Sequence, residues 1–186
     1  MKFNPLTKYF CKFLGIFCIL YYGTYVFIGL SVPGGYYVSI FDHYLNYPTW
    51  LRTSILAGSK FLLGILGYRA SIQDRFVLRL EDLTYVRLVY GCLAYGIMSF
   101  WIAFVFSNKG TFKKKSLWVL GGVVGIWLIN IVRISALLVA NSTQTKLPFG
   151  MDHHTLFDIC AYTLVFTMIY LYDTRFFARH KQFLET

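Results

Sequence analysis

A permanently charged side chain, Arg133, lies inside the apolar run 117–140, which is long enough to cross a bilayer as a helix. A guanidinium in that position costs several kcal/mol, so charged residues inside membrane segments mark functional sites more often than packing positions. Asn130 precedes Arg133 by one helical turn. We therefore expect a helical membrane bundle in which other helices supply partners for Arg133.

The composition sets the class of protein. The chain of 186 residues is 57% hydrophobic and only 14% charged, which is typical of a polytopic membrane protein. We expect an all-α fold and one membrane-embedded domain over residues 1–186. The net charge of +10 would suit nucleic acid, but the basic residues flank apolar runs. Topology and contact with anionic membrane lipid explain them better, so nucleic acid is not an expected partner.

The apolar pattern predicts about four to five transmembrane helices plus a short amphipathic or re-entrant helix. The stretches expected to cross are 9–30, 88–107, 117–140 and 155–172. Residues 51–67 are apolar but few and contain Lys60, which suits a re-entrant or tilted helix. Residues 68–87 mix charged and apolar side chains, a pattern that indicates an amphipathic connector at the membrane surface.

Basic segments orient these helices. The lysine-rich segment 108–116 and the basic segment after residue 172 belong in the cytoplasm by the positive-inside rule, which sends residues 141–154 to the outer face. The same rule puts residues 69–87 outside. With a cytoplasmic N-terminus this requires that residues 51–67 do not cross, and we favour that arrangement. A full crossing there, with an outward N-terminus, is the alternative.

Rare polar residues on three helices then converge near the outer face. Cys92, Arg133 and the pair His153 and His154 all fall within roughly 10 Å of that surface at ~1.5 Å of helix rise per residue. A thiol needs a nearby cation or base to become a nucleophilic thiolate. Arg133 supplies the charge and either histidine the proton acceptor. Asp158, four residues after His154, would orient that imidazole as in a Cys-His-Asp triad.

At these residues the chain resembles the exosortase/archaeosortase family, multi-pass membrane transpeptidases with a Cys, an Arg and a His or second Arg on successive helices. The residues Asn130, Arg133 and Ile134 match the family's N-x-x-R-I motif, Cys92 lies in Gly-Cys-Leu-Ala-Tyr-Gly, and His153 and His154 stand where the third residue is expected. The resemblance covers about 86–172. The short chain is similar to a compact form, such as the exosortase F type.

The resemblance implies a multi-pass protein of the cell (inner) membrane with its active site on the extracytoplasmic side. It also implies substrates that are secreted proteins with a C-terminal sorting signal, made of a short motif, an apolar helix and a basic tail. Cys92 would form a thioester and pass the protein to an acceptor amine. Whether the enzyme is a transferase or a protease stays open, as does which of the two histidines acts.

Several of these residues also have simpler structural interpretations. Arg133 could be structural, or bind an anionic group, in a non-enzymatic assembly or lipid-binding subunit. Cys11, Cys18 and Cys160 suit ordinary packing positions, and Gly121 with Gly125 forms a G-x-x-x-G pair whose usual meaning is close helix packing. No nucleotide or cofactor motif is present, so no cofactor is expected. The histidine pair lacks an accepted metal-ligand spacing, so no metal is expected either.

Overall fold

The computed structural model describes residues 4–31, 40, 46–143 and 153–182, and for part of the last stretch it describes the backbone alone. The helices are α1 (Pro5–Ser31), α3 (Tyr47–Ile65), the 3₁₀ turn η1 (Tyr90–Leu93), α4 (Tyr95–Ser107), α5 (Phe112–Ser142) and α6 (His153–Gln182). The strands are β1 (Ala70–Gln73), β2 (Val77–Leu80) and β3 (Tyr85–Arg87).

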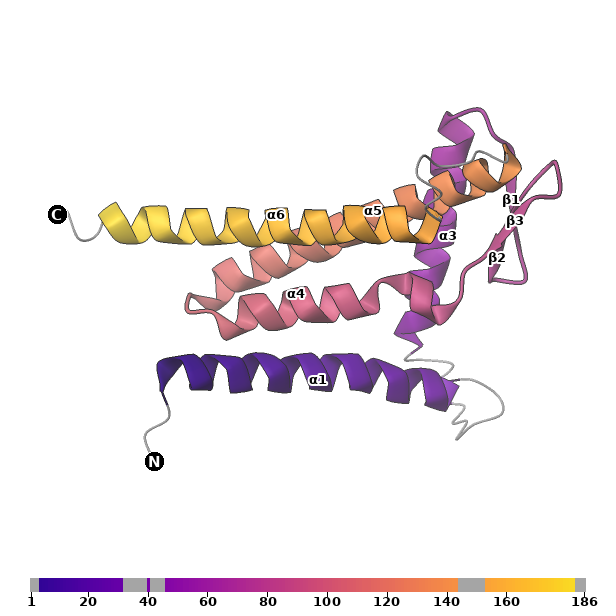
Figure 1. The fold of residues 1–186 in the computed structure, drawn as a ribbon. Helices are drawn as coiled ribbons and strands as arrows, with labels where there is room; N and C mark the ends of the chain where they lie inside the picture. Colours follow the sequence, from indigo (N-terminus) through magenta and orange to yellow (C-terminus); the bar gives the residue numbers. More distant parts are fainter. Residues whose placement is uncertain (1–3, 32–39, 41–45, 144–152, 183–186) are drawn as a thin grey trace.

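Four helices, α1, α4, α5 and α6, run roughly along one direction (Figure 1). Neighbouring members of this set contact each other in the order α1, α4, α5 and α6. Both termini lie at one end of the bundle, and the small sheet lies at the other (Figure 1). The bundle therefore has a terminal end and a sheet end, and the sheet end carries the residues discussed below.

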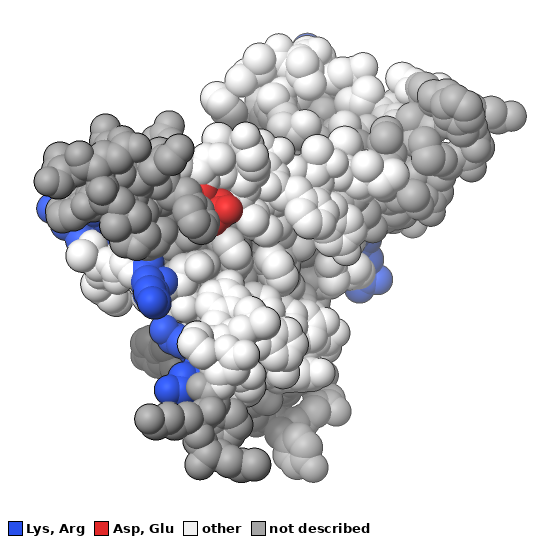
Figure 2. All heavy atoms as spheres, turned by 60° about the vertical axis from the view of Figure 1, so that its left-hand side comes forward, with Lys and Arg blue, Asp and Glu red and all other residues white. Residues whose placement is uncertain are grey.

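The expected, predominantly helical fold is confirmed. In the described residues, α1 and α5 are both long and apolar enough to cross a membrane, and α4 is apolar but shorter. Figure 2 shows a largely uncharged surface on the described part of the chain, with most of the visible Lys and Arg down the left side and a further group at the right. An uncharged flank of this kind suits contact with lipid.

Helix α3 lies across the other helices instead of alongside them (Figure 1). Asn46 begins it, because its side-chain Oδ1 accepts a hydrogen bond from Thr49 N at 3.1 Å, and Pro48 suits the first turn. The helix predicted for residues 51–67 is confirmed, and its tilted or re-entrant placement in the membrane stays a prediction. Its exposed face carries Trp50 and Phe61, as expected for a helix that lies in a membrane interface.

The segment expected as an amphipathic connector departs from the all-α prediction. It forms a three-stranded antiparallel sheet in the order β1-β2-β3, with Ile72 opposite Leu78 and Leu78 opposite Val86. Leu78 and Leu80 are buried, and the intervening Arg79 is less so. This alternation with period two is a strand pattern, which favours a sheet over a helix once one face can pack against α3 and α5.

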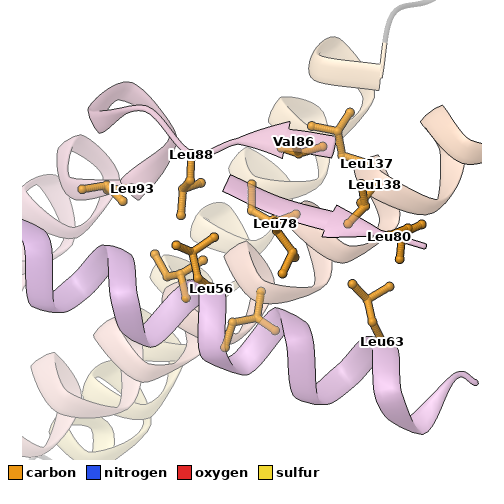
Figure 3. Close-up of a cluster of buried hydrophobic side chains, with 12 residues drawn as sticks. Leu56, Leu63, Leu78, Leu80, Val86, Leu88, Leu93, Leu137 and Leu138 are labelled. Carbon is orange, nitrogen blue, oxygen red and sulfur yellow. The ribbon is translucent and has the colours of Figure 1, made fainter. Parts of the chain in front are cut away.

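The main core lies where α3, the sheet, η1 and α5 meet (Figure 3). Its buried side chains are Ile55, Leu56, Leu63, Leu78, Leu80, Val86, Leu88, Leu93, Ile131, Ile134, Leu137 and Leu138. Each fully buried aliphatic side chain contributes about 1.5–3 kcal/mol relative to exposure to water. This cluster fixes η1, and hence Cys92, against two helices and a sheet.

Small residues let α3 approach α5 closely. A Cβ on Gly58 would overlap the Ile131 side chain. Beside it, Ser59 Oγ donates to Ile131 O at 3.3 Å, and Ser135 Oγ donates to Ser59 O at 3.4 Å. Trp127 Nε1 also donates to Ser54 Oγ at 3.0 Å. The contact between these helices is therefore close and hydrogen-bonded along its length.

Helices α4 and α5 also meet at a glycine, but not at the predicted pair. A Cβ on Gly122 would overlap the indole of Trp101, whose Nε1 donates to Trp118 O at 3.1 Å. Among the described residues, a Cβ on Gly121 or on Gly125 would meet nothing within 4 Å. The assignment of the G-x-x-x-G pair to close packing was wrong, because the Trp101 ring approaches the helix face that Gly122 occupies.

Candidate functional site at the sheet end

Cys92 lies in the 3₁₀ turn η1, between the sheet and α4. The sequence predicts a helix from residue 88, which would place Cys92 inside it; α4 instead begins at Tyr95. Ala94 separates the two elements with a left-handed backbone (φ 57°), which interrupts the helix. Cys92 is partly buried. Its thiol belongs to a short turn that precedes α4 and not to the interior of a helix.

Asn130 ties this turn to α5. Its side-chain Nδ2 donates to the carbonyl oxygen of Cys92 at 2.8 Å. Asn130 is only 2% exposed, and its Oδ1 is buried without a hydrogen-bond partner in the part of the chain that the structure describes. A buried amide is costly unless it is hydrogen-bonded, so this contact fixes the turn at a defined height on α5.

Arg133 follows Asn130 by three residues on α5, so the two side chains neighbour each other along the helix surface. Arg133 is half-buried. It lies one turn beyond Asn130 toward the C-terminal part of α5, where Leu137 and Leu138 contact the core beneath the sheet (Figure 3). Asn130 and Arg133 thus share a face of α5 at the sheet end, and Asn130 holds the backbone of Cys92.

The predicted histidines lie at the start of α6. His153 is the first residue of that helix and His154 the second, which agrees with their predicted place at a helix end. The side chains of His153, His154 and Asp158 lie outside the described residues. Their parts in the site therefore stay predictions.

Arg52 is a residue that the sequence reasoning missed. It lies on α3 and is 1% exposed, with its Cζ 4.0 Å from the ring centroid of Tyr90 and 4.4 Å from that of Phe76. Tyr90 is the first residue of η1, the turn that contains Cys92. The signal was present, since Arg52 is a charged residue in the apolar run 51–67, as Arg133 is in its own run.

The opposite end of the bundle is basic. Lys12 Nζ donates to Phe106 O at 2.9 Å, and Lys115 Nζ donates to the same oxygen at 3.1 Å. These lysines satisfy a carbonyl at the C-terminal end of α4, where the helix dipole favours cations. Lys12 and Lys115 therefore lie at the end of the bundle away from Cys92.

The sheet is joined to α5 by a polar contact outside the apolar bundle. Ser142 Oγ donates a hydrogen bond to Asp82 Oδ2, and Thr84 N donates to Asp82 Oδ1 at 2.9 Å. The Ser142 hydroxyl, followed by the Thr84 backbone N–H, lowers the pKa of the Asp82 carboxyl below its ordinary value. This contact holds the β2–β3 turn against the last turn of α5.

Comparison with known proteins shows the family of the chain. The sequence model of the transmembrane exosortase family matches residues 10–171. The match extends well beyond the motif region into the N-terminal half of the chain. No curated protein and no solved structure matches the chain. Because the family model spans most of its length, from α1 to α6, the chain belongs to the transmembrane exosortase family.

Proposed function

We propose that this protein is a membrane cysteine transpeptidase that cleaves the C-terminal sorting signal of secreted proteins and transfers them to an acceptor. The hydrogen bond from Asn130 to the carbonyl of Cys92 carries the proposal, because it joins the two motif segments. Membership of the transmembrane exosortase family supports the reaction class. The proposed catalytic residues are Cys92, Arg133 and one of His153 and His154, with Asn130 and Asp158 in support.

In the first half of the reaction, the Cys92 sulfur attacks the carbonyl carbon of the scissile peptide bond while a histidine accepts the thiol proton. The carbonyl oxygen becomes an oxyanion, which the Arg133 guanidinium stabilises. Collapse of this intermediate breaks the C–N bond, and the leaving amine takes the proton back from the imidazolium. The products are a thioester on Cys92 and the released apolar helix with its basic tail.

In the second half, an amine of the acceptor or a water molecule attacks the thioester carbonyl. The same histidine accepts the proton of the attacking group, and the Cys92 sulfur leaves and is protonated again. The nucleophile that arrives decides between transfer and hydrolysis. Transfer to an acceptor is the proposal, as the resemblance implies.

We place Cys92 at the outer side of the cell membrane. The support is the lysine-rich connection between α4 and α5 at the end away from η1, next to Lys12. Short cytoplasmic loops of membrane proteins are rich in Lys and Arg. On this placement α3 lies flat at the outer interface and does not cross. The substrate helix then spans the same bilayer with its basic tail inside and its motif at the level of Cys92.

The experiment uses a reporter protein, which is secreted by the cells that make this enzyme. The reporter ends in a short motif, an apolar helix and a basic tail. Cys92→Ala and Cys92→Ser are expected to abolish processing of the reporter while membrane levels of the protein stay normal. Cys160→Ala is the matched control, because Cys160 is exposed on α6. Normal processing in both Cys92 variants would favour the non-enzymatic assembly or lipid-binding subunit, in which only Arg133 is sensitive to substitution.

A further inference from the structure

Arg52 is a buried cation that the proposed reaction does not use. Its side chain is 1% exposed, and its Nε and Nη1 atoms are buried without a hydrogen-bond partner among the described residues. The ion pair found in the described part of the chain joins Arg69 to Glu81 at the surface. Arg52 therefore has no described carboxylate to neutralise it.

Two aromatic rings enclose the guanidinium instead. Its Cζ lies 4.0 Å from the centroid of Tyr90 and 4.4 Å from that of Phe76. A cation is attracted to the negative face of an aromatic ring, most strongly where water is excluded. Phe76 comes directly before β2, and Tyr90 begins η1. One side chain of α3 thus contacts both the sheet turn and the turn that contains Cys92.

Stability alone does not explain a cation at this position. Replacing a buried charge with an apolar side chain of similar size is often neutral or stabilising, because the charge must be stripped of water. Ile55 and Leu56, on the next turn of α3, belong to the apolar core. An unbranched apolar side chain at position 52 would extend that core, so the cation points to a role beyond holding the fold.

We propose that Arg52 is a positioning residue for the Cys92 nucleophile, acting through its contact with Tyr90. Tyr90 and Cys92 share the four-residue turn η1. Arg52 holds the start of this turn and Asn130 holds the Cys92 carbonyl, so the nucleophile is fixed from α3 and from α5. Short 3₁₀ turns have weak internal hydrogen bonds, which makes such external contacts important. This proposal rests on the function proposed above.

The test compares Arg52→Met and Arg52→Lys in proteoliposomes with the reporter defined above. Because a misplacement of about 1 Å can cost roughly 100-fold in rate, we expect Arg52→Met to lower kcat by roughly 10- to 100-fold. Its KM and its thermal unfolding midpoint should stay at or above the wild-type values. Arg52→Lys keeps a cation over the rings and should recover most of the rate. Arg87→Met, which removes an exposed charge three residues before Tyr90, should match the wild type.

Variants of Tyr90 test whether Arg52 acts through its contact with Tyr90. Tyr90→Phe keeps the aromatic face and should retain the rate, whereas Tyr90→Leu should lose as much as Arg52→Met. The double variant Arg52→Met with Tyr90→Leu should be no slower than either single variant, because both remove one contact. Losses that multiply in the double variant would overturn the proposal.

Two further outcomes also count against it. A wild-type kcat in Arg52→Met, or a loss of rate matched by a fall in the unfolding midpoint, would overturn the positioning role. Failure of the underlying function gives a different result, since the Cys92→Ala variant would then process the reporter normally. The two failures are therefore distinguishable within one set of variants.

Discussion

The side-chain Nδ2 of Asn130 lies 2.8 Å from the carbonyl oxygen of Cys92, a hydrogen bond between residues 38 positions apart in the chain. This bond gives a physical meaning to the spacing of the N-x-x-R motif. The asparagine holds the backbone of the turn that contains the thiol, and the arginine lies one helical turn further along. A motif that looks like one unit in sequence thus has a positioning part and a charged part.

The first prediction concerns Asn130. Asn130→Ala leaves the Cys92 carbonyl without its donor, which is expected to cost about 1–3 kcal/mol of stability and to slow reporter processing. Asn141→Ala is the control, because Asn141 is exposed on the same helix. Thermal unfolding in detergent and the rate of processing measure the two effects. Equal values for the two alanine variants would show that the hydrogen bond is unimportant.

The second prediction concerns Arg133. Arg133→Lys keeps the positive charge but loses the planar fork of donors, so an oxyanion would be stabilised poorly. We expect a fall in kcat of roughly 10²- to 10³-fold, as for the loss of one oxyanion donor. Arg87→Lys, at an exposed site in β3, is the control and should retain the wild-type kcat. Full activity in Arg133→Lys would reduce the role of this residue to its charge.

The third prediction separates two adjacent glycines of α5. Gly122→Ala forces a Cβ into the indole of Trp101 and is expected to destabilise the protein by about 1–3 kcal/mol. The Cβ of Gly121→Ala meets none of the described residues within 4 Å, so this variant should be neutral or stabilising by up to about 1 kcal/mol, because Ala favours helix. The unfolding midpoints of the two variants should therefore move in opposite directions. A larger loss for Gly121→Ala would contradict the observed packing.

The fourth prediction is a pH dependence at the sheet. The hydrogen bond from Ser142, with that from Thr84 N, lowers the pKa of Asp82 below its ordinary value of 3.8. A group with a lowered folded-state pKa stabilises the fold above its unfolded pKa and loses that contribution as pH falls through the folded value. Asp82→Asn should therefore unfold more easily than the wild type at pH 7, with the difference shrinking as pH falls below about 4 and disappearing below the folded-state pKa. A difference that persists unchanged into acid would argue against the contact.

The fifth prediction tests the placement in the membrane. In a cysteine-free variant, Ser71→Cys in β1 should react with an impermeant thiol reagent added to whole cells. Lys114→Cys near the start of α5 should react only after the membrane is opened. Both positions are exposed, so burial does not bias the comparison. The reverse labelling pattern would show that the protein has the opposite orientation in the membrane.

Much of the helical framework was predictable because long apolar runs leave few alternatives in a bilayer. The run 117–140 became the central part of α5, and residues 9–30 became most of α1. The sequence singled out Asn130 as part of a motif, but it did not predict that Asn130 would bind the carbonyl of Cys92. The convergence of Arg133 on Cys92 stays a prediction. The number of crossing helices and the exosortase F type stay predictions.

What the sequence did not predict depends on tertiary contacts. The segment with β1, β2 and β3 is amphipathic as either a strand or a helix, and the apolar faces of α3 and α5 decide between them. Position 94 carries an ordinary alanine, yet its left-handed backbone ends η1 and places Cys92 outside α4. Likewise, only the position of Trp101 selects Gly122 over its neighbours as the packing glycine.

The most direct measurement of the central claim is the chemical state of Cys92 during turnover. The protein is quenched in acid while it processes the reporter, and the peptide containing Cys92 is analysed by mass spectrometry. The account predicts a mass increase equal to the N-terminal part of the cleaved reporter, attached through a thioester that hydroxylamine releases. A reporter that is cleaved while Cys92 stays unmodified, together with an adduct on another residue, would contradict it.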